Sequence, residues 1–269
     1  MLLKLRRKKL LLRLGVLLLA LIVIPLVVML VQSVRMWRVT GNVLGLMDGG
    51  YFAVAADEVD SYRYKLVKSE DDCKMLIAVY YYAKRAERLE WCAERCMANG
   101  FKGSNVMIGL ALGRSLAGRD DDALVVLDLL LQKDSSNSEA MLHMAEILLK
   151  KRQNDQAGKF FMKAARLAPK DTAILSAALK FFIGVRDWQR ARELADYVRA
   201  LDAPSYALKL HAARALIGAG DTVGAESLKE QVLLQVKGNQ QLKNKLILSF
   251  PDLFKPFSFM PVVPQKPGG

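Results

Sequence analysis

Apolar residues recur every three or four positions along most of this chain, and short polar stretches interrupt them at regular intervals. Around residues 141–148, for example, Met141, Met144, Ile147 and Leu148 share one side of a helix. No strand-like alternation of comparable length is present. The interruptions are rich in residues that favour turns and cap helices, as in Gly118-Arg-Asp-Asp-Asp, Arg152-Gln-Asn-Asp, Arg186-Asp and Gly220-Asp. This pattern predicts an all-α chain of helix pairs joined by short turns.

The pattern repeats with a fixed period of 34 residues, marked by Ala123, Ala157, Ala191 and Ala225, with Ala55 two periods earlier. Leu89 interrupts the series. A small residue is expected where the second helix of a pair presses against the first, because a larger side chain would hold the helices apart. A fixed period of this length indicates a stack of helix pairs that bury their apolar faces against one another.

The clearest unit, residues 138–171, resembles a tetratricopeptide repeat. The positions that carry the resemblance are Met141, Met144, Ala145, Leu148, Ala157, Phe161, Ala164 and Pro169. The resemblance is best over residues 104–204, and two rougher helix pairs are expected near Val39 to Tyr64 and Asp71 to Met97. It implies a helical solenoid of about five to six helix pairs over residues 35–237.

Residues 14–34 contain no charged side chain and are almost wholly apolar. At a rise of 1.5 Å per residue, they would form a helix about 31 Å long, which matches the hydrocarbon core of a bilayer. We therefore expect a single transmembrane helix here, preceded by a basic stub at residues 1–13.

The charges around residues 14–34 predict the topology. Six Lys or Arg residues and no acid precede this segment. The positive-inside rule then places the N-terminus in the cytoplasm and the repeats across the membrane. A cleaved signal peptide is the competing interpretation, but Val31-Gln-Ser33 is a poor cleavage site. The expected location is the bacterial inner membrane with the C-terminal domain in the periplasm, and a eukaryotic type II protein facing the endoplasmic reticulum lumen has the same topology.

The net charge of +13 does not indicate nucleic-acid binding. Six of the 40 Lys and Arg residues lie in the stub, and the remaining 34 exceed the 27 acidic residues by only seven. Enzyme motifs are absent: there is no Gly-rich phosphate loop and no nucleophile elbow. His143 and Glu146 share a helix face, but such a pair is more often solvated or packed than a metal site. We expect no enzyme activity, no cofactor, no metal and no small-molecule substrate.

Three cysteines, Cys73, Cys92 and Cys96, fall in the second rough helix pair. Cys92 and Cys96 share one helix face, and Cys73 on the partner helix could reach either of them. The alternatives left open are buried thiols that serve as small apolar residues, one disulfide with a leftover thiol, and a metal or redox centre.

In the tetratricopeptide family the first helices of successive units line a groove that receives a partner's peptide or helix. The resemblance implies a mainly apolar groove with scattered positive charge. Its expected residues are Ile108, Leu112, Leu142, Leu149, Lys150, Lys180, Ile183, Leu210, Arg214 and Ile217.

The C-terminal region, residues 238–269, has a different composition. Five of the eight prolines fall in the last 19 residues, interleaved with aromatic residues. Proline disfavours helix and favours extended backbone, so we expect a stiff tail that seeks a groove in the same chain or in another subunit. The aromatic contact residues of this tail are Phe250, Phe254, Phe257 and Phe259.

These features together predict a non-enzymatic, membrane-anchored scaffold or adaptor with protein partners in a bacterial envelope complex, such as a secretion or pilus assembly. A periplasmic chaperone for exported proteins is the alternative of the same binding class. A thiol redox or metal-binding protein that uses the three cysteines is the alternative of a different class.

Overall fold

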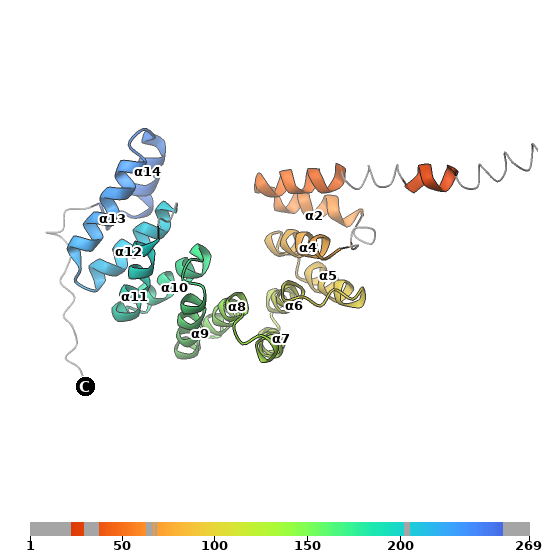
Figure 1. Ribbon diagram of the computed structural model, residues 1–269, viewed down its shortest axis with the longest axis horizontal. Coiled ribbons are helices and arrows are strands. Elements are labelled where there is room, and N and C mark those ends of the chain that lie inside the picture. Colours follow the sequence, from red (N-terminus) through yellow and green to blue (C-terminus); the bar gives the residue numbers. More distant parts are fainter. Residues whose placement is uncertain (1–22, 30–37, 63–66, 68, 202–204, 255–269) are drawn as a thin grey trace, which may run out of the picture. The chain divides into compact units, whose positions relative to one another are not determined.

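A computed structural model describes residues 23–29, 38–62, 67, 69–201 and 205–254 (Figure 1). Within these residues every regular element is a helix, which confirms the all-α expectation there. Residues 38–48 form the first helix after the N-terminal segment. The following helices are α2 (Phe52–Asp60), α4 (Glu70–Tyr82), α5 (Ala86–Ala98), α6 (Ser104–Leu116), α7 (Asp120–Lys133), α8 (Ser138–Lys150), α9 (Asn154–Leu167), α10 (Thr172–Gly184), α11 (Trp188–Ala200), α12 (Tyr206–Gly218), α13 (Thr222–Gln235) and α14 (Gln240–Ser249).

The helix starts follow the 34-residue period without deviation. First helices begin at residues 70, 104, 138, 172, 206 and 240. Second helices begin at residues 52, 86, 120, 154, 188 and 222. Each described repeat therefore has the same two-helix plan, and α14 begins where the first helix of a further repeat would begin.

Polar side chains cap the starts of the first helices α4, α8, α10, α12 and α14, whereas α6 follows Gly103. The side chain of Asn137 accepts a hydrogen bond from the Ala140 amide, and Asp171 does the same for Ala173 and Ile174. These bonds satisfy amides that have no partner inside the helix. The residue before the first helix lies at the same repeat position throughout: Ser69, Gly103, Asn137, Asp171, Ser205 and Asn239.

The turn inside each repeat uses one residue with positive φ. Glycine occupies this position at Gly50, Gly118 and Gly220, whereas Lys84, Arg152 and Arg186 adopt it with a side chain. The left-handed conformation disfavours side chains other than glycine, so these three turns carry a small local strain.

The periodic alanine is the fourth residue of each second helix except α5, where Leu89 takes this place. Ala55, Ala123, Ala157 and Ala191 have no exposed surface, and Ala225 is 2% exposed. Each helix therefore presses its fourth residue into the core, as the period predicts.

Leu89 shows how the series tolerates one large residue. Leu89 is also fully buried, but the residue one turn later in α5 is the small Ala93. In α9 the order is reversed, with Ala157 followed one turn later by the buried Phe161. Because residues four apart share a helix face, exchanging large and small side chains conserves the volume of the contact.

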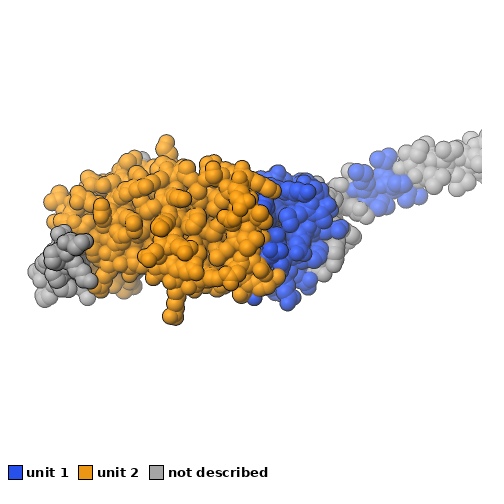
Figure 2. All heavy atoms as spheres, turned by 90° about the horizontal axis from the view of Figure 1, so that it is seen from below, with its two compact units in different colours: residues 1–117 blue, residues 118–269 orange. Residues whose placement is uncertain are grey.

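The described helices divide into two compact units, residues 1–117 and 118–269 (Figure 2). In the second unit α9 joins α10 through aromatic rings: Phe161 lies 4.9 Å from Phe181, and Phe181 lies 5.0 Å from Phe182. Further along, a Cβ at Gly218 of α12 would collide with the Trp188 ring of α11. These close contacts form the core that holds the first helices in place.

The predicted transmembrane helix falls mostly outside the described residues. Residues 23–29, the described part of 14–34, are helical with exposed side chains. Among the described helices, none has the length and apolar character needed to span a bilayer.

The C-terminal region differs from the extended tail predicted for residues 238–269. Helix α14 fills Gln240–Ser249, and the Asn239 side chain caps it by accepting from the Leu242 amide. The prolines responsible for the expectation of extended backbone begin only at Pro251, and a residue that precedes proline disfavours helix. The helical pattern therefore continues to Ser249.

Candidate partner-binding surface

The first helices α8, α10 and α12 of the second unit lie side by side, because α10 contacts both α8 and α12. Their outward residues recur at the same three repeat positions. We call this surface the first-helix face of unit 2. Its rows are His143, Ala177 and His211; Glu146, Lys180 and Arg214; and Leu149, Ile183 and Ile217.

The expected groove residues divide into exposed and covered positions. Leu149, Lys150 and Lys180 are exposed, and Leu112, Ile183, Arg214 and Ile217 are half-buried. Ile108, Leu142 and Leu210 are buried, with exposed fractions of 3%, 9% and 0%. These three offer almost no surface to a partner in this structure. Ile108 and Leu112 belong to α6 in the first unit, whereas the other residues belong to the second.

The basic residues of the expected groove differ in their partners. Lys150 donates a hydrogen bond of 2.7 Å to the Asp120 carboxylate of α7, and Lys151 pairs with Asp121. The acidic run at the start of α7 therefore pairs with the basic end of α8. This run lies inside α7, because the N-cap position of the helix is Arg119. Lys180 remains exposed, and no ion pair of it is found in the part of the chain that the structure describes.

His211 lies among positive charges on this face. Burial lowers the pKa of its imidazole, and repulsion from Lys180 and Arg214 lowers it further, to about 4. Asp252 acts in the opposite direction. His211 is therefore neutral at pH 7, and its ring can pack as an apolar plate.

The start of the C-terminal tail packs on α12. The Phe250 ring meets the His211 ring edge-on with centroids 4.9 Å apart, and the Arg214 guanidinium lies 5.2 Å from the Phe250 centroid. Arg214 also grips Asp252 through two hydrogen bonds, of which Nε to Oδ2 measures 2.6 Å. Phe254 is half-buried, whereas Phe257 and Phe259 lie outside the described residues.

Asp252 is the residue of this contact that the sequence interpretation missed. It is the only acidic residue after Glu230, in a region that carries several lysines. A single acid in a basic, aromatic tail is a signal for an internal ion pair, but its partner, 38 residues earlier, could not be identified from spacing.

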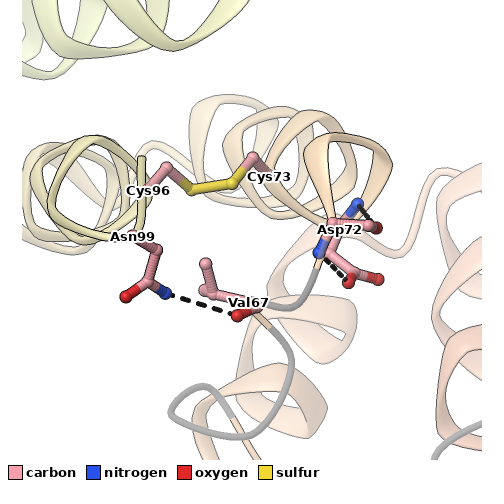
Figure 3. Close-up of a disulfide and its surroundings, with 6 residues drawn as sticks. Val67, Asp72, Cys73, Cys96 and Asn99 are labelled. Carbon is pink, nitrogen blue, oxygen red and sulfur yellow. Dashed lines mark hydrogen bonds between the residues drawn. A yellow bond between two sulfur atoms is a disulfide. The ribbon is translucent and has the colours of Figure 1, made fainter. Parts of the chain in front are cut away.

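The cysteines of unit 1 form one disulfide, Cys73–Cys96, which ties α4 to α5 with Cα atoms 6.0 Å apart (Figure 3). Nearby, the Asn99 amide donates to the Val67 carbonyl at 3.3 Å. Cys92 keeps a free thiol, and burial raises its pKa to about 12. A buried protonated thiol is a poor nucleophile and metal ligand. Within the described residues no group of His, Cys, Asp and Glu side chains could hold a metal ion.

Comparisons with known proteins agree with this arrangement. A family model described as tetratricopeptide repeat matches residues 116–180. No curated protein sequence matches the chain.

Among solved structures, the C-terminal part of a tetratricopeptide-repeat protein from Cytophaga hutchinsonii is 16% identical with a TM-score of 0.52, covering 77% of this chain and 83% of that one. PilF of Pseudomonas aeruginosa is 16% identical with a TM-score of 0.50, covering 80% and 98%. A thermophilic protein of the same repeat type from Thermus thermophilus is 15% identical with a TM-score of 0.49, covering 69% and 98%. These identities are low, so the similarity concerns the fold alone. Residues 116–180 match the tetratricopeptide-repeat model, and the chain shares its helical fold with the two structures whose TM-scores are 0.50 and 0.52.

Proposed function

We propose that this chain is a non-enzymatic, membrane-anchored scaffold that holds a protein partner on the first-helix face of unit 2, as a fixed subunit of a bacterial envelope complex such as a secretion or pilus assembly. The observation that carries the proposal is an uncovered patch on α8 and α10. Leu149 is 40% exposed, Ile183 is half-buried, and Lys180 is exposed beside them.

This patch has the composition of an interaction site. Leu149 and Ile183 occupy the same repeat position on neighbouring helices, so they form one apolar row. The positive Lys180 borders that row. An amphipathic helix or an extended segment with an apolar side and a nearby acid would match both features.

The anchoring and the compartment are part of the proposal. The apolar segment at residues 14–34 and the basic stub before it favour one crossing with the repeats outside the cytoplasm. The Cys73–Cys96 disulfide supports this location, because disulfides persist in oxidising compartments such as the periplasm. A protease-accessibility assay on spheroplasts tests it: the repeats should be cleaved without lysis, and protection until lysis would contradict the orientation.

A periplasmic chaperone is the second candidate, since the row of Leu149 and Ile183 could also hold unfolded clients. The two functions differ in partner number. A scaffold keeps one partner set, whereas a chaperone binds many clients weakly.

Photo-crosslinking at Ile183 on native membranes tests the proposed surface. The matched control is the same crosslinker at Lys163, an exposed position on the second helix α9. A discrete adduct at position 183 and none at 163 is the expected result. A broad smear at position 183 would favour the chaperone, and adducts only at position 163 would move the binding surface to the other side of the repeats.

A further inference from the structure

Helix α14 is the last helix in the described part of the chain, and the residues that follow it are more deeply buried in unit 2 than the helix itself. Helix α14 begins at a first-helix position and ends at Ser249, and residues 251–253 form a turn. Within α14 only Leu246 is buried, and Leu248 is 80% exposed. The next four residues contain two buried side chains, Phe250 at 6% and Leu253 at 2%.

Two groups of the segment after α14 contact α12: an aromatic ring and, two residues later, a carboxylate. Phe250 offers an aromatic ring to His211 and Arg214. Two residues later, Asp252 offers a carboxylate to the Arg214 guanidinium, and planar two-bond pairs of this kind are among the strongest polar contacts in proteins. One arginine therefore contacts both the ring and the acid.

The site is confined to α12, and its charge is only partly matched. At the two equivalent positions α10 carries Ala177 and Lys180, so it lacks the aromatic plate. Lys180 is nevertheless close enough to affect His211. Because Asp252 is the only acid in the tail, the tail leaves the positive charge of Lys180 unmatched.

We infer that His211 and Arg214 form a recognition site for an acidic partner segment that presents an aromatic ring and, two residues later, a carboxylate, and that residues 250–253 occupy this site as an internal ligand. The inference rests on the proposed scaffold function and names the chemistry of its partner. A tethered ligand acts at an effective concentration on the order of millimolar, so a partner must displace the tail before it can bind.

Peptide binding to the full-length protein in detergent tests the site. The probe is a fluorescent peptide with the sequence of residues 248–254, Leu-Ser-Phe-Pro-Asp-Leu-Phe, measured by anisotropy. The double variant F250A/D252N vacates the site and should bind the peptide at least about tenfold more tightly than the wild type. Adding R214Q to it should remove most of this gain, and a peptide with asparagine in place of the aspartate should bind about tenfold more weakly.

A matched control separates the site from a general charge effect. R192Q in the same background also removes an arginine, but from an exposed position on the second helix α11. It should leave peptide binding unchanged. Equal losses from R192Q and R214Q would overturn the inference.

Other outcomes also decide the question. A vacated variant that melts earlier but gains no peptide binding would show that the tail is only a structural cap. If the double variant does not fold, D252N alone keeps the Phe250 packing and should still bind the peptide more tightly than the wild type. Concentration-dependent dimers that D252N abolishes would overturn the intramolecular assignment in favour of tail exchange between two copies.

The peptide result is independent of the photo-crosslinking result. A discrete partner adduct at position 183 without peptide binding would remove this inference and leave the scaffold. Peptide binding without any partner adduct at position 183 would remove the proposed scaffold and leave the recognition of the peptide by His211 and Arg214.

Discussion

The two units secure the same helix-pair contact in different ways. In unit 1 the fourth residue of α4 and the eleventh of α5 are Cys73 and Cys96, joined by a disulfide. In unit 2 the same positions of α8 and α9 are Met141 and Ala164, which are buried apolar residues. The repeat geometry therefore fixes where the helices meet, and either covalent or apolar chemistry can serve at that point.

Removing the disulfide should give the largest effect on stability, and this effect should be confined to unit 1. The variant C73A/C96A should lower the free energy of unfolding of unit 1 by about 2–4 kcal/mol, because the unfolded chain regains the entropy of the opened loop. Hydrogen exchange should then increase in α4 and α5 and stay unchanged in α8 to α11. A reducing agent should reproduce the effect on the wild type and do nothing further to the variant, and equal loss of protection in both units would contradict the distinction.

Enlarging a periodic alanine should destabilise the apolar packing between the helices of unit 2. A157L forces a larger side chain against the next turn, where Phe161 already fills the space. It should cost about 1–3 kcal/mol by overpacking. The control A173L adds the same volume at an exposed position of α10 and should change stability by less than about 0.5 kcal/mol in denaturant titration. Similar losses for both variants would show that the alanine position is not under steric constraint.

Acid should weaken unit 2 through His211. The folded-state pKa of His211 is about 4, below its ordinary value of 6.5, so the unfolded chain binds the proton more readily. This contribution to stability is present above pH 6.5 and is lost as the pH falls towards 4. Its size should be about 1 kcal/mol, less than the full shift, since His211 is partly exposed and screened.

The pH measurement compares the melting temperatures of the wild type and H211F between pH 7 and pH 4. H211F keeps an aromatic plate for Phe250 and removes the titrating group, so it should lose less stability with acid. Parallel curves for the two proteins would exclude His211 as the source.

Relieving turn strain should give the smallest effect. Arg186 adopts a φ of 57°, whereas Gly220 occupies the equivalent turn with a φ of 85°. R186G should stabilise unit 2 by about 0.5 kcal/mol, because glycine tolerates this conformation but gains entropy in the unfolded chain. The reverse change G220R should destabilise it by about 1 kcal/mol. The midpoint of urea unfolding should resolve both signs, and a loss of stability with R186G would refute the strain.

Local patterns predicted the helices well because each repeat carries its own signals. Asp187 and Asp221 cap α11 and α13 as their place after a turn predicts. The alanine period predicted the positions of the second helices, because the close approach of the two helices of a pair favours a small residue at the same repeat position. The absence of proline from residues 238–250 was the available signal for α14, but the composition of the whole C-terminal region hid it.

Non-local contacts were beyond the reach of those patterns. Cys92 and Cys96 share a helix face one turn apart, so only the position of Cys73 in space decides which of them forms the bond. The pair of Arg214 with Asp252 joins residues 38 positions apart through a turn that the repeat does not contain. The expected groove also included Leu142 and Leu210, which pack inward, because spacing alone does not separate the face of a helix from its flank.

Crosslinking mass spectrometry on native membranes, after mild detergent extraction, tests the scaffold function most directly. The predicted result is one stoichiometric set of partners whose crosslinks concentrate on Lys180, at the uncovered part of the first-helix face of unit 2. Many substoichiometric clients without a constant partner would contradict the scaffold and leave the chaperone as the function of this surface.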